Sequence, residues 1–323
     1  MCSILNLNCS FRRADYTLWT GNRLFPLSFS GTRWLDDTRV AERAIDTWKF
    51  LTIYVEKISA GPKSLRPKCS SYNMVERSVK DPLMLAKLHY FVRVAKILHP
   101  FLQSFQADSP MLPFMEQELI KIFRSLMENF VRPSKLTAES SLAALMDIDI
   151  DKDENLLACK NVSIGFAAKE QLSQVQNLSE AKLTEFKYQS LVCYKEILKK
   201  ISGRIPPETL SFISNLSSIN PRYIINHPNS TISRFETLLL YLSKRKIRSS
   251  TVCDSLLSQY KQLTKKLRTE AKEECLGFFS SGNRLDTFFM NVIGRNMEYF
   301  GKLKSRFFQV FITRQYKNWY ILH

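Results

Sequence analysis

The sequence has little of what loop-rich, secreted or membrane-spanning proteins contain. Its 323 residues include only 9 glycines and 12 prolines, which argues against a low-complexity chain. The 7 cysteines are an odd number without a C-x-x-C pair, so we expect neither a disulfide framework nor a paired-cysteine zinc site. No apolar run approaches the roughly 20 residues that span a bilayer. We therefore expect a soluble intracellular protein without a membrane partner.

Common catalytic motifs are also missing. The sequence contains no G-x-x-x-x-G-K-[ST] loop, no G-x-G-x-x-G turn, no G-x-S-x-G and no H-E-x-x-H. The acidic run from Asp147 to Glu154 begins like a calcium-binding loop. However, Lys152 and Ala158 occupy the sixth and twelfth positions, where that loop needs Gly and Glu. We expect no catalytic residue, no metal site and no cofactor.

The residues that are present can form a helical core. Hydrophobic residues make up 45% of the chain, with 22 Phe, 12 Tyr and 4 Trp among them. Apolar residues recur at the three- and four-residue spacing of amphipathic helices in 41–55, 84–105, 119–130, 183–201, 235–242 and 252–267. The segment 25–30, "FPLSFS", favours one short strand. The sequence thus predicts a mainly α fold, an irregular helical array with a small β remnant near the N-terminus.

Acids and prolines predict where helices begin and end. Asp36 and Asp37 stand where the N-cap or first turn of a helix is expected. Pro100 predicts a kink or break in the helix that starts near residue 84. The segment 220–233 is expected to be a loop, with Ser230 or Thr231 capping the helix that follows.

Changes in composition predict five segments. These are an irregular segment with the strand remnant (1–34), a first helical lobe (35–132), a solvated acidic connector (133–180), a second helical lobe (181–300) and a basic, aromatic tail (301–323).

Positive charge is the clearest functional signal. Lys and Arg outnumber Asp and Glu by 47 to 30, a net charge of +17, which favours a polyanionic partner such as DNA. Lys261, Lys265 and Arg268 are three or four residues apart and share one helix face. A solvated face that only keeps the protein soluble explains this stripe equally well. The candidate phosphate-binding residues are Lys244, Arg245, Lys246, Arg248, Lys261, Lys265, Lys266 and Arg268.

The run "KRKIR" at 244–248 also matches a nuclear-import cluster, which favours a nuclear over a cytoplasmic location.

Three long segments carry a family resemblance. They are "ADYTLWTGNRLFPLSFSGTRWLDDTRVAERAIDTW" (14–48), "KDPLMLAKLHYFVRVAKILHPFLQSFQADSPMLPFMEQEL" (80–119) and "GNRLDTFF" (282–289). In this order they resemble a group of uncharacterised animal proteins derived from hAT-superfamily transposases, whose catalytic core is RNase H-like. The T-R-W at Thr32, Arg33 and Trp34 is similar to the hAT junction between the core strands and a large helical insertion. The resemblance implies that "SFSGTRW" is the edge of the core and that the insertion begins after it.

Departures from the family pattern bear on activity. In that superfamily three acids hold the catalytic metals, and two of them lie upstream of T-R-W. Only 31 residues precede Thr32 here, and Asp15 is not matched to either acid. The third acid belongs to a carboxy-terminal segment that is not found before His323. The resemblance therefore implies the helical insertion region, truncated at both ends, and we expect no enzymatic activity.

Four functions remain open from the sequence. The first is a catalytically inactive, transposase-derived helical protein that binds nucleic acid without sequence preference. The second is an interaction scaffold whose exposed apolar helix faces dock another protein or form a homo-oligomer. The others are an active nuclease or transposase with dispersed acids and a relic open reading frame without selected function.

Overall fold

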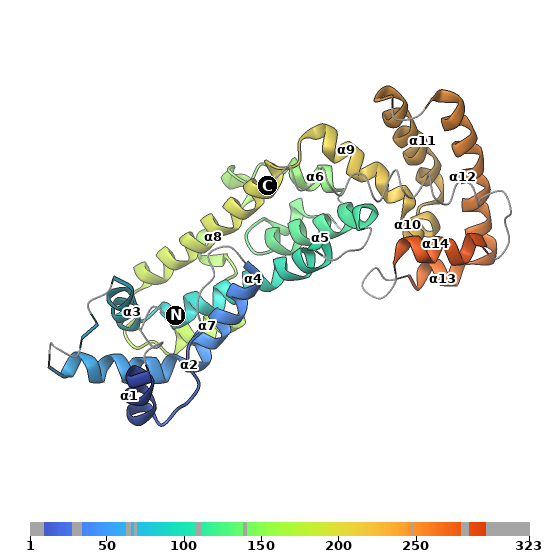
Figure 1. Cartoon of the computed structure of the whole chain (residues 1–323). Coiled ribbons are helices and arrows are strands. Elements are labelled where there is room, and N and C mark those ends of the chain that lie inside the picture. The colour runs from blue at the N-terminus through green and yellow to red at the C-terminus, as the bar shows by residue number, and fades with distance from the viewer. Residues whose placement is uncertain are drawn as a thin grey trace. The chain divides into compact units, whose positions relative to one another are not determined.

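A computed structural model describes residues 10–27, 34–62, 66–67, 70–106, 111–137, 141–246, 249–278 and 284–294. The α-helices are α1 (Ser10–Thr20), α2 (Trp34–Ala60), α3 (Ser70–Lys80), α4 (Met84–Gln106), α5 (Met115–Met127), α6 (Leu142–Met146), α7 (Phe166–Ser173), α8 (Glu180–Ser202), α9 (Pro207–Leu216), α10 (Pro221–Asn226), α11 (Pro228–Lys244), α12 (Ser250–Glu270), α13 (Lys272–Leu276) and α14 (Leu285–Gly294). Short 3₁₀ helices are η2 (Leu112–Phe114), η3 (Pro133–Lys135), η4 (Asp153–Asn155), η5 (Cys159–Asn161) and η6 (Ser217–Ile219). Figure 1 shows these helices, which confirm the mainly α fold.

The chain divides into two compact units, each assembled from separate stretches of sequence. Unit 1 comprises Met1–Gln103, Ser125–Arg132 and Leu156–Tyr194. Unit 2 comprises Ser104–Arg124, Pro133–Asn155 and Lys195–His323. This division differs from the predicted succession of lobe, connector and lobe, because the boundaries fall within α4, α5 and α8.

One core of unit 1 joins α1, α2 and α3. Leu51, Val55 and Ile58 follow one another at helical spacing on α2 and are fully or almost fully buried. Tyr16 of α1 packs edge-on against Tyr54 of α2, with ring centroids 5.4 Å apart. Such aromatic contacts add to the apolar burial that holds short helices in place.

A polar contact joins α4 to α8 elsewhere in unit 1. The guanidinium of Arg93 donates to Asn129 Oδ1 at 2.8 Å, and to Ser163 Oγ and the Tyr194 hydroxyl at 3.3 Å. Gly165 lies against the Arg93 side chain with φ of +89°, and a Cβ at this position would stand 2.4 Å from Arg93 Cδ. Arg93 thus fixes the segment that leads into α7.

The core of unit 2 is built around an antiparallel pair, α11 and α12, which lie side by side in Figure 1. Phe235 of α11 stacks on Tyr260 of α12, with ring centroids 3.7 Å apart. The Tyr260 hydroxyl donates to the Ser218 carbonyl, and burial raises its pKa above the ordinary tyrosine value. The pair therefore shares one apolar seam, and α11 also packs against α9 within the same core.

A buried ion pair supports the same unit. Glu116, at the start of α5, accepts from Arg234 of α11 at 2.6 Å and from the Ser214 hydroxyl at 2.7 Å. Arg234 also donates to Ser217 Oγ and lies 4.7 Å over the Tyr223 ring. The Glu116 side chain is only 7% exposed, so this contact is shielded from water.

The amino-terminal region differs from the prediction. Residues 10–20 form α1 rather than an irregular segment, because Tyr16 is fully buried against α2 and α3. Residues 25–27 of the predicted strand have no regular structure, and 28–30 lie outside the described residues. In the described part of the chain the β contacts amount to one isolated bridge, between Val131 and Leu156. Helix α2 begins at Trp34, so Asp36 and Asp37 fall in its first turn.

Prolines have other effects than predicted. Pro100 lies inside α4 without ending it, and the residue is exposed. The expected break is therefore wrong, whereas a kink at this position stays a prediction. The predicted loop at 220–233 contains α10 and the start of α11, with Pro221 and Pro228 near the first helical positions. The cap of α11 is His227 rather than Ser230 or Thr231, so that prediction is wrong.

The acidic segment 147–154 is anchored rather than free. Asp151 lies 2.9 Å from Lys199 and 3.6 Å from Lys195 of α8, and these lysines hold the pKa of its carboxyl below the ordinary value. The Asn155 side chain donates to the Asp149 carbonyl at 2.8 Å. The segment thus packs within unit 2, although its acids remain exposed.

Candidate nucleic-acid interface

The first group of predicted basic residues lies where α11 ends. Lys244 is the last residue of α11, and Arg245 and Lys246 form the turn that follows. All three are exposed, and the Arg245 guanidinium lies 4.8 Å over the Tyr241 ring. Lys246 has φ of +54°, which turns the chain sharply toward α12. We call these three residues the turn cluster; Arg248 lies outside the described residues.

The second group lies on α12. Lys261 and Lys265 are exposed and one helical turn apart, whereas Leu256, Tyr260 and Leu263 face the core. Among the residues that the structure describes, neither lysine is within ion-pair distance of a carboxylate. We call them the α12 pair. Their ammonium groups are therefore open to an external anion.

Two predicted residues of α12 are engaged within the protein. Arg268 donates to the Pro228 carbonyl at the start of α11, at 3.2 Å, and its Nε is buried. The Lys266 side chain is 16% exposed and lies 3.7 Å from the Glu270 carboxylate. Arg268 lies on the face of the α12 pair, as the spacing predicted, but its guanidinium ties α12 to α11.

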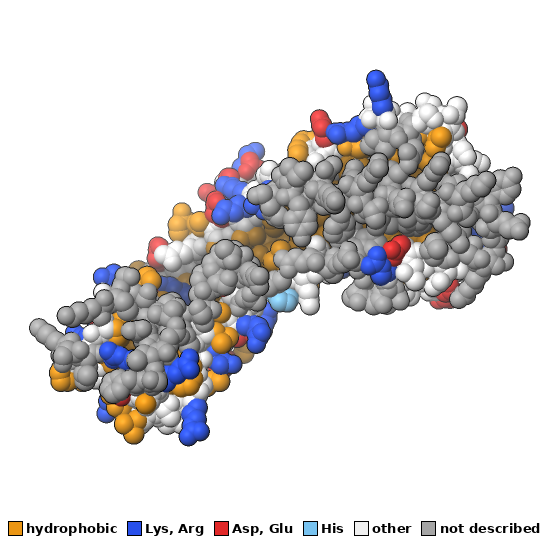
Figure 2. All heavy atoms as spheres, in the orientation of Figure 1, with side chains coloured by type: hydrophobic (Ala, Val, Ile, Leu, Met, Phe, Trp, Pro, Cys, Tyr) orange, Lys and Arg blue, Asp and Glu red, His pale blue; other side chains and the backbone are white. Residues whose placement is uncertain are grey.

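The two groups form separate patches. Lys261 follows Ser250 by eleven positions, a rise of roughly 16 Å along α12. The turn cluster thus sits at one end of the α11–α12 hairpin and the α12 pair lies well along it. On the face shown in Figure 2, Lys and Arg side chains are scattered among other types rather than gathered in one field. The stripe predicted from Lys261, Lys265 and Arg268 thus reduces to the α12 pair, and the turn cluster forms a second patch.

Two exposed apolar side chains lie beside the turn cluster, and the sequence did not predict the exposure of either one. Leu240 of α11 is 56% exposed and Val252 of α12 is 42% exposed. The sequence pattern made no prediction for Leu240, whereas Phe235, Leu238 and Leu242 of the same helix are buried. Val252 was expected on the apolar face of α12, but it lies in the first turn and is exposed.

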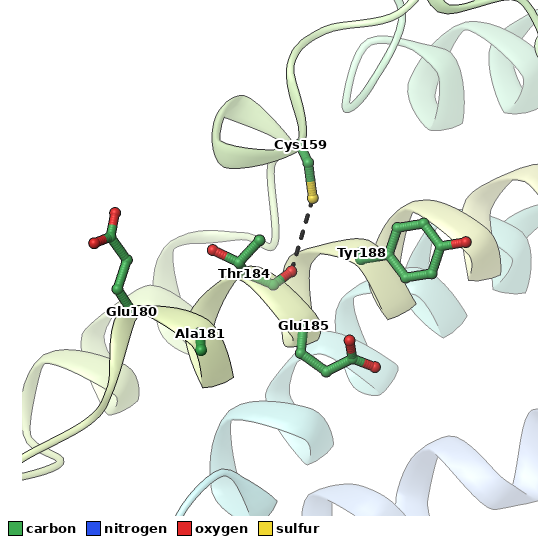
Figure 3. Close-up of a pocket in the computed structure, with 6 residues that line it drawn as sticks. All are labelled: Cys159, Glu180, Ala181, Thr184, Glu185 and Tyr188. Atoms are coloured by element: carbon green, nitrogen blue, oxygen red, sulfur yellow. Dashed lines mark hydrogen bonds between the residues drawn. The ribbon is translucent and has the colours of Figure 1, made fainter.

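A depression of about 610 Å³ lies along one side of α8 in unit 1. Figure 3 shows its lining: Cys159, Glu180, Ala181, Thr184, Glu185 and Tyr188. The Cys159 thiol donates to the Thr184 carbonyl at 3.7 Å. Glu180 and Glu185 point in different directions, so their carboxylates do not converge on one point. This arrangement gives no acid–base or metal-binding constellation.

The remaining predictions concern metals, membranes and the T-R-W junction. Within the described ranges, no group of three or more His, Cys, Asp or Glu side chains could hold a metal ion. No helix in that part of the chain has the length and apolarity needed to cross a membrane. Thr32 and Arg33 lie outside the described residues, and Trp34 is the first residue of α2.

Comparison with known proteins adds no assignment. Neither the family models, the curated proteins nor the solved structures include a match to this chain.

Proposed function

We propose that the chain is a catalytically inactive, transposase-derived helical protein that binds nucleic acid, with DNA as its partner, through phosphate contacts without sequence preference. The observation that carries the binding is the α12 pair, two exposed lysines without a carboxylate partner among the described residues, on a chain of net charge +17. The turn cluster adds three cations on the same hairpin. The transposase origin is supported by the resemblance of residues 14–48, 80–119 and 282–289.

Phosphate contacts give a particular salt dependence. Each cation that neutralises a phosphate releases a condensed counterion, so the affinity falls as salt rises. For duplex DNA the slope of log K against log salt is about −0.9 per contact. Contacts from both patches, five cations in all, would therefore give a slope of about −4 to −5.

The test is a fluorescence-anisotropy titration of the purified chain against a random DNA duplex between about 50 and 200 mM salt. Replacing Lys261 and Lys265 by Gln should weaken binding and make the slope shallower by about 1.8. The matched control is Lys195→Gln with Lys199→Gln, which removes the same charge from lysines that already pair with Asp151. Equal losses of affinity in both double variants would show that only the net charge of the chain matters.

Catalytic inactivity has its own test. Cleavage of DNA strands by the purified chain in the presence of magnesium would contradict the proposal that it is catalytically inactive.

A nuclear location belongs to the same proposal. It is supported by the basic sequence 244–248, of which the turn cluster is exposed. Imaging of a fluorescent fusion tests this, because replacing the turn cluster by Ala should shift the protein to the cytoplasm.

An interaction scaffold, including a homo-oligomer, is the second candidate. It is favoured by Phe166, which is 82% exposed at the start of α7, whereas Ala168 and Leu172 of the same helix are buried. An exposed aromatic side chain of this kind is common where one protein docks on another. A relic open reading frame without selected function remains the expectation if both tests fail.

A further inference from the structure

Helix α8 carries a stripe of residues on the side away from its core. Phe186, Ser190 and Tyr194 are buried and define the inner face of the helix. On the opposite face, residues recur at alternating intervals of four and three positions, the spacing of a seam between two paired helices. These residues, which we call the α8 stripe, are Ala181, Glu185, Tyr188, Val192, Lys195 and Lys199. All of them except the half-buried Lys195 are exposed.

The centre of the α8 stripe is apolar. The side chain of Tyr188 is 55% exposed, and that of Val192, one helical turn further along, is 39% exposed. Figure 3 shows Tyr188 beside the depression that Ala181 and Glu185 also line. Exposed tyrosine is enriched where proteins meet, and an apolar helix face with regular spacing fits a second helix. The centre of the stripe therefore offers a contact to another helix.

Charges of opposite sign lie on the two sides of this centre. Glu185 precedes it; among the residues that the structure describes, Glu185 has no ion pair and accepts from the Gln189 side chain at 2.7 Å. Lys195 and Lys199 follow it and lie 3.6 and 2.9 Å from Asp151. The Asp151 side chain is 60% exposed, so both ammonium groups are at the surface. An ammonium group has three donors and can also bind a second carboxylate.

The order acid, apolar, base complements itself when it is reversed. In an antiparallel pair of α8 helices with a twofold axis level with position 190, position 188 faces 192 and position 185 faces 195. Tyr188 of each copy then contacts Val192 of the other, and Glu185 faces Lys195. In a parallel pair, Glu185 would face Glu185 and Lys195 would face Lys195, which repel. Position 190 is within one residue of the middle of α8, so the antiparallel helices overlap over almost their whole length.

We propose that α8 pairs with α8 of a second copy of the chain to form an antiparallel homodimer. The interface is isologous, so each contact occurs twice. One pair of helices is a small contact compared with the interfaces of obligate dimers, and the dimer is therefore weak and depends on protein concentration. This inference rests on the second candidate function, the scaffold, for which it names the partner and the surface. It does not depend on nucleic-acid binding.

The experiment is sedimentation velocity of the full chain at several protein concentrations in about 0.15 M salt. It is run in parallel on Phe166→Ser, so that docking through α7 does not contribute. In both chains, Tyr188→Ser and Val192→Ser should each weaken dimer formation several-fold. Both side chains face solvent, so circular dichroism should show unchanged helix content.

Two charge reversals test the pairing itself. Glu185→Lys raises the net charge and Lys195→Glu lowers it, so an effect of net charge alone would change the association in opposite directions. Antiparallel pairing predicts that each variant associates several-fold more weakly, because each places like charges opposite one another. A mixture of the two variants should restore the dimer, since every position 185 then faces an opposite charge at position 195. Glu236→Lys, which makes the same charge change on an exposed position of α11, is the control.

The outcomes separate this inference from both candidate functions. A chain that stays monomeric, or a dimer that Tyr188→Ser and Val192→Ser leave unchanged, would overturn the inference. So would charge variants whose mixture does not restore the dimer. An association that Phe166→Ser abolishes would overturn the pairing of α8 while supporting a scaffold that acts through α7. Absence of binding to duplex DNA would refute only the nucleic-acid proposal.

Discussion

At the scale of single residues, Glu116 makes the most consequential buried contact. Replacing it by Ala should leave the Arg234 guanidinium without its charged partner. We expect a loss of about 3 kcal/mol, the lower end for breaking a buried ion pair, because Arg234 keeps the Ser214 carbonyl and the Ser217 hydroxyl as acceptors. Hydrogen exchange of the backbone amides of α11 measures this loss of stability, because the amides of a less stable helix exchange faster.

The control for Glu116 is an exposed ion pair of α5. Lys121 lies close to Glu118, and the Lys121 side chain is 67% exposed. Lys121→Ala should change local stability by less than about 0.5 kcal/mol, because water screens such pairs. Similar effects of Lys121→Ala and Glu116→Ala on α11 would show that the Glu116–Arg234 contact is not a stabilising one.

At the scale of elements, the start of α7 depends on Gly165. Gly165→Ala should destabilise unit 1 by about 2–4 kcal/mol, because its positive φ strains an L residue and the new Cβ would meet Arg93 Cδ. Gly21→Ala is the matched control: φ is +68°, but nothing lies within 4 Å of the added Cβ. This control should cost about 1 kcal/mol. Urea unfolding followed by circular dichroism compares the two, and equal losses would exclude a role for the Arg93 contact.

Elements were predictable from sequence where one face is consistently apolar. Helix α12 was expected because Leu256, Tyr260 and Leu263 recur at helical spacing, and all three are buried. Helix α1 was missed because its burial depends on Tyr16 packing against residues of α2 and α3, which local spacing does not reveal. Pro100 was overvalued as a breaker, because it removes only one hydrogen-bond donor from α4 and the packing of the rest of the helix is not visible in the local sequence.

The candidate site was predictable in part. Spacing placed Lys261, Lys265 and Arg268 on one face, because helical periodicity depends only on sequence separation. It could not show that Arg268 donates to the Pro228 carbonyl, a contact between residues 40 positions apart. That contact depends on tertiary packing.

At the scale of the whole molecule, the net charge of +17 sets opposite salt dependences for the two candidate functions. Binding to a polyanion weakens as salt rises, because counterion release is less favourable. Association between two copies through apolar faces strengthens, because salt screens the repulsion between like-charged molecules. The sign of the salt effect therefore distinguishes phosphate contacts from apolar docking.

We predict that self-association, where it occurs, increases between about 0.1 and 0.5 M salt, as the screening length falls from about 10 Å toward about 4 Å. Size-exclusion chromatography with light scattering measures the mass at several protein concentrations. Phe166→Ser should reduce the association, because it removes the exposed aromatic ring of α7 without touching the buried Ala168 and Leu172. Lys169→Ser, an exposed change on the same helix, is the control and should slightly favour association by lowering the net charge. An association that weakens with salt, or that Phe166→Ser leaves intact, would exclude docking through this face.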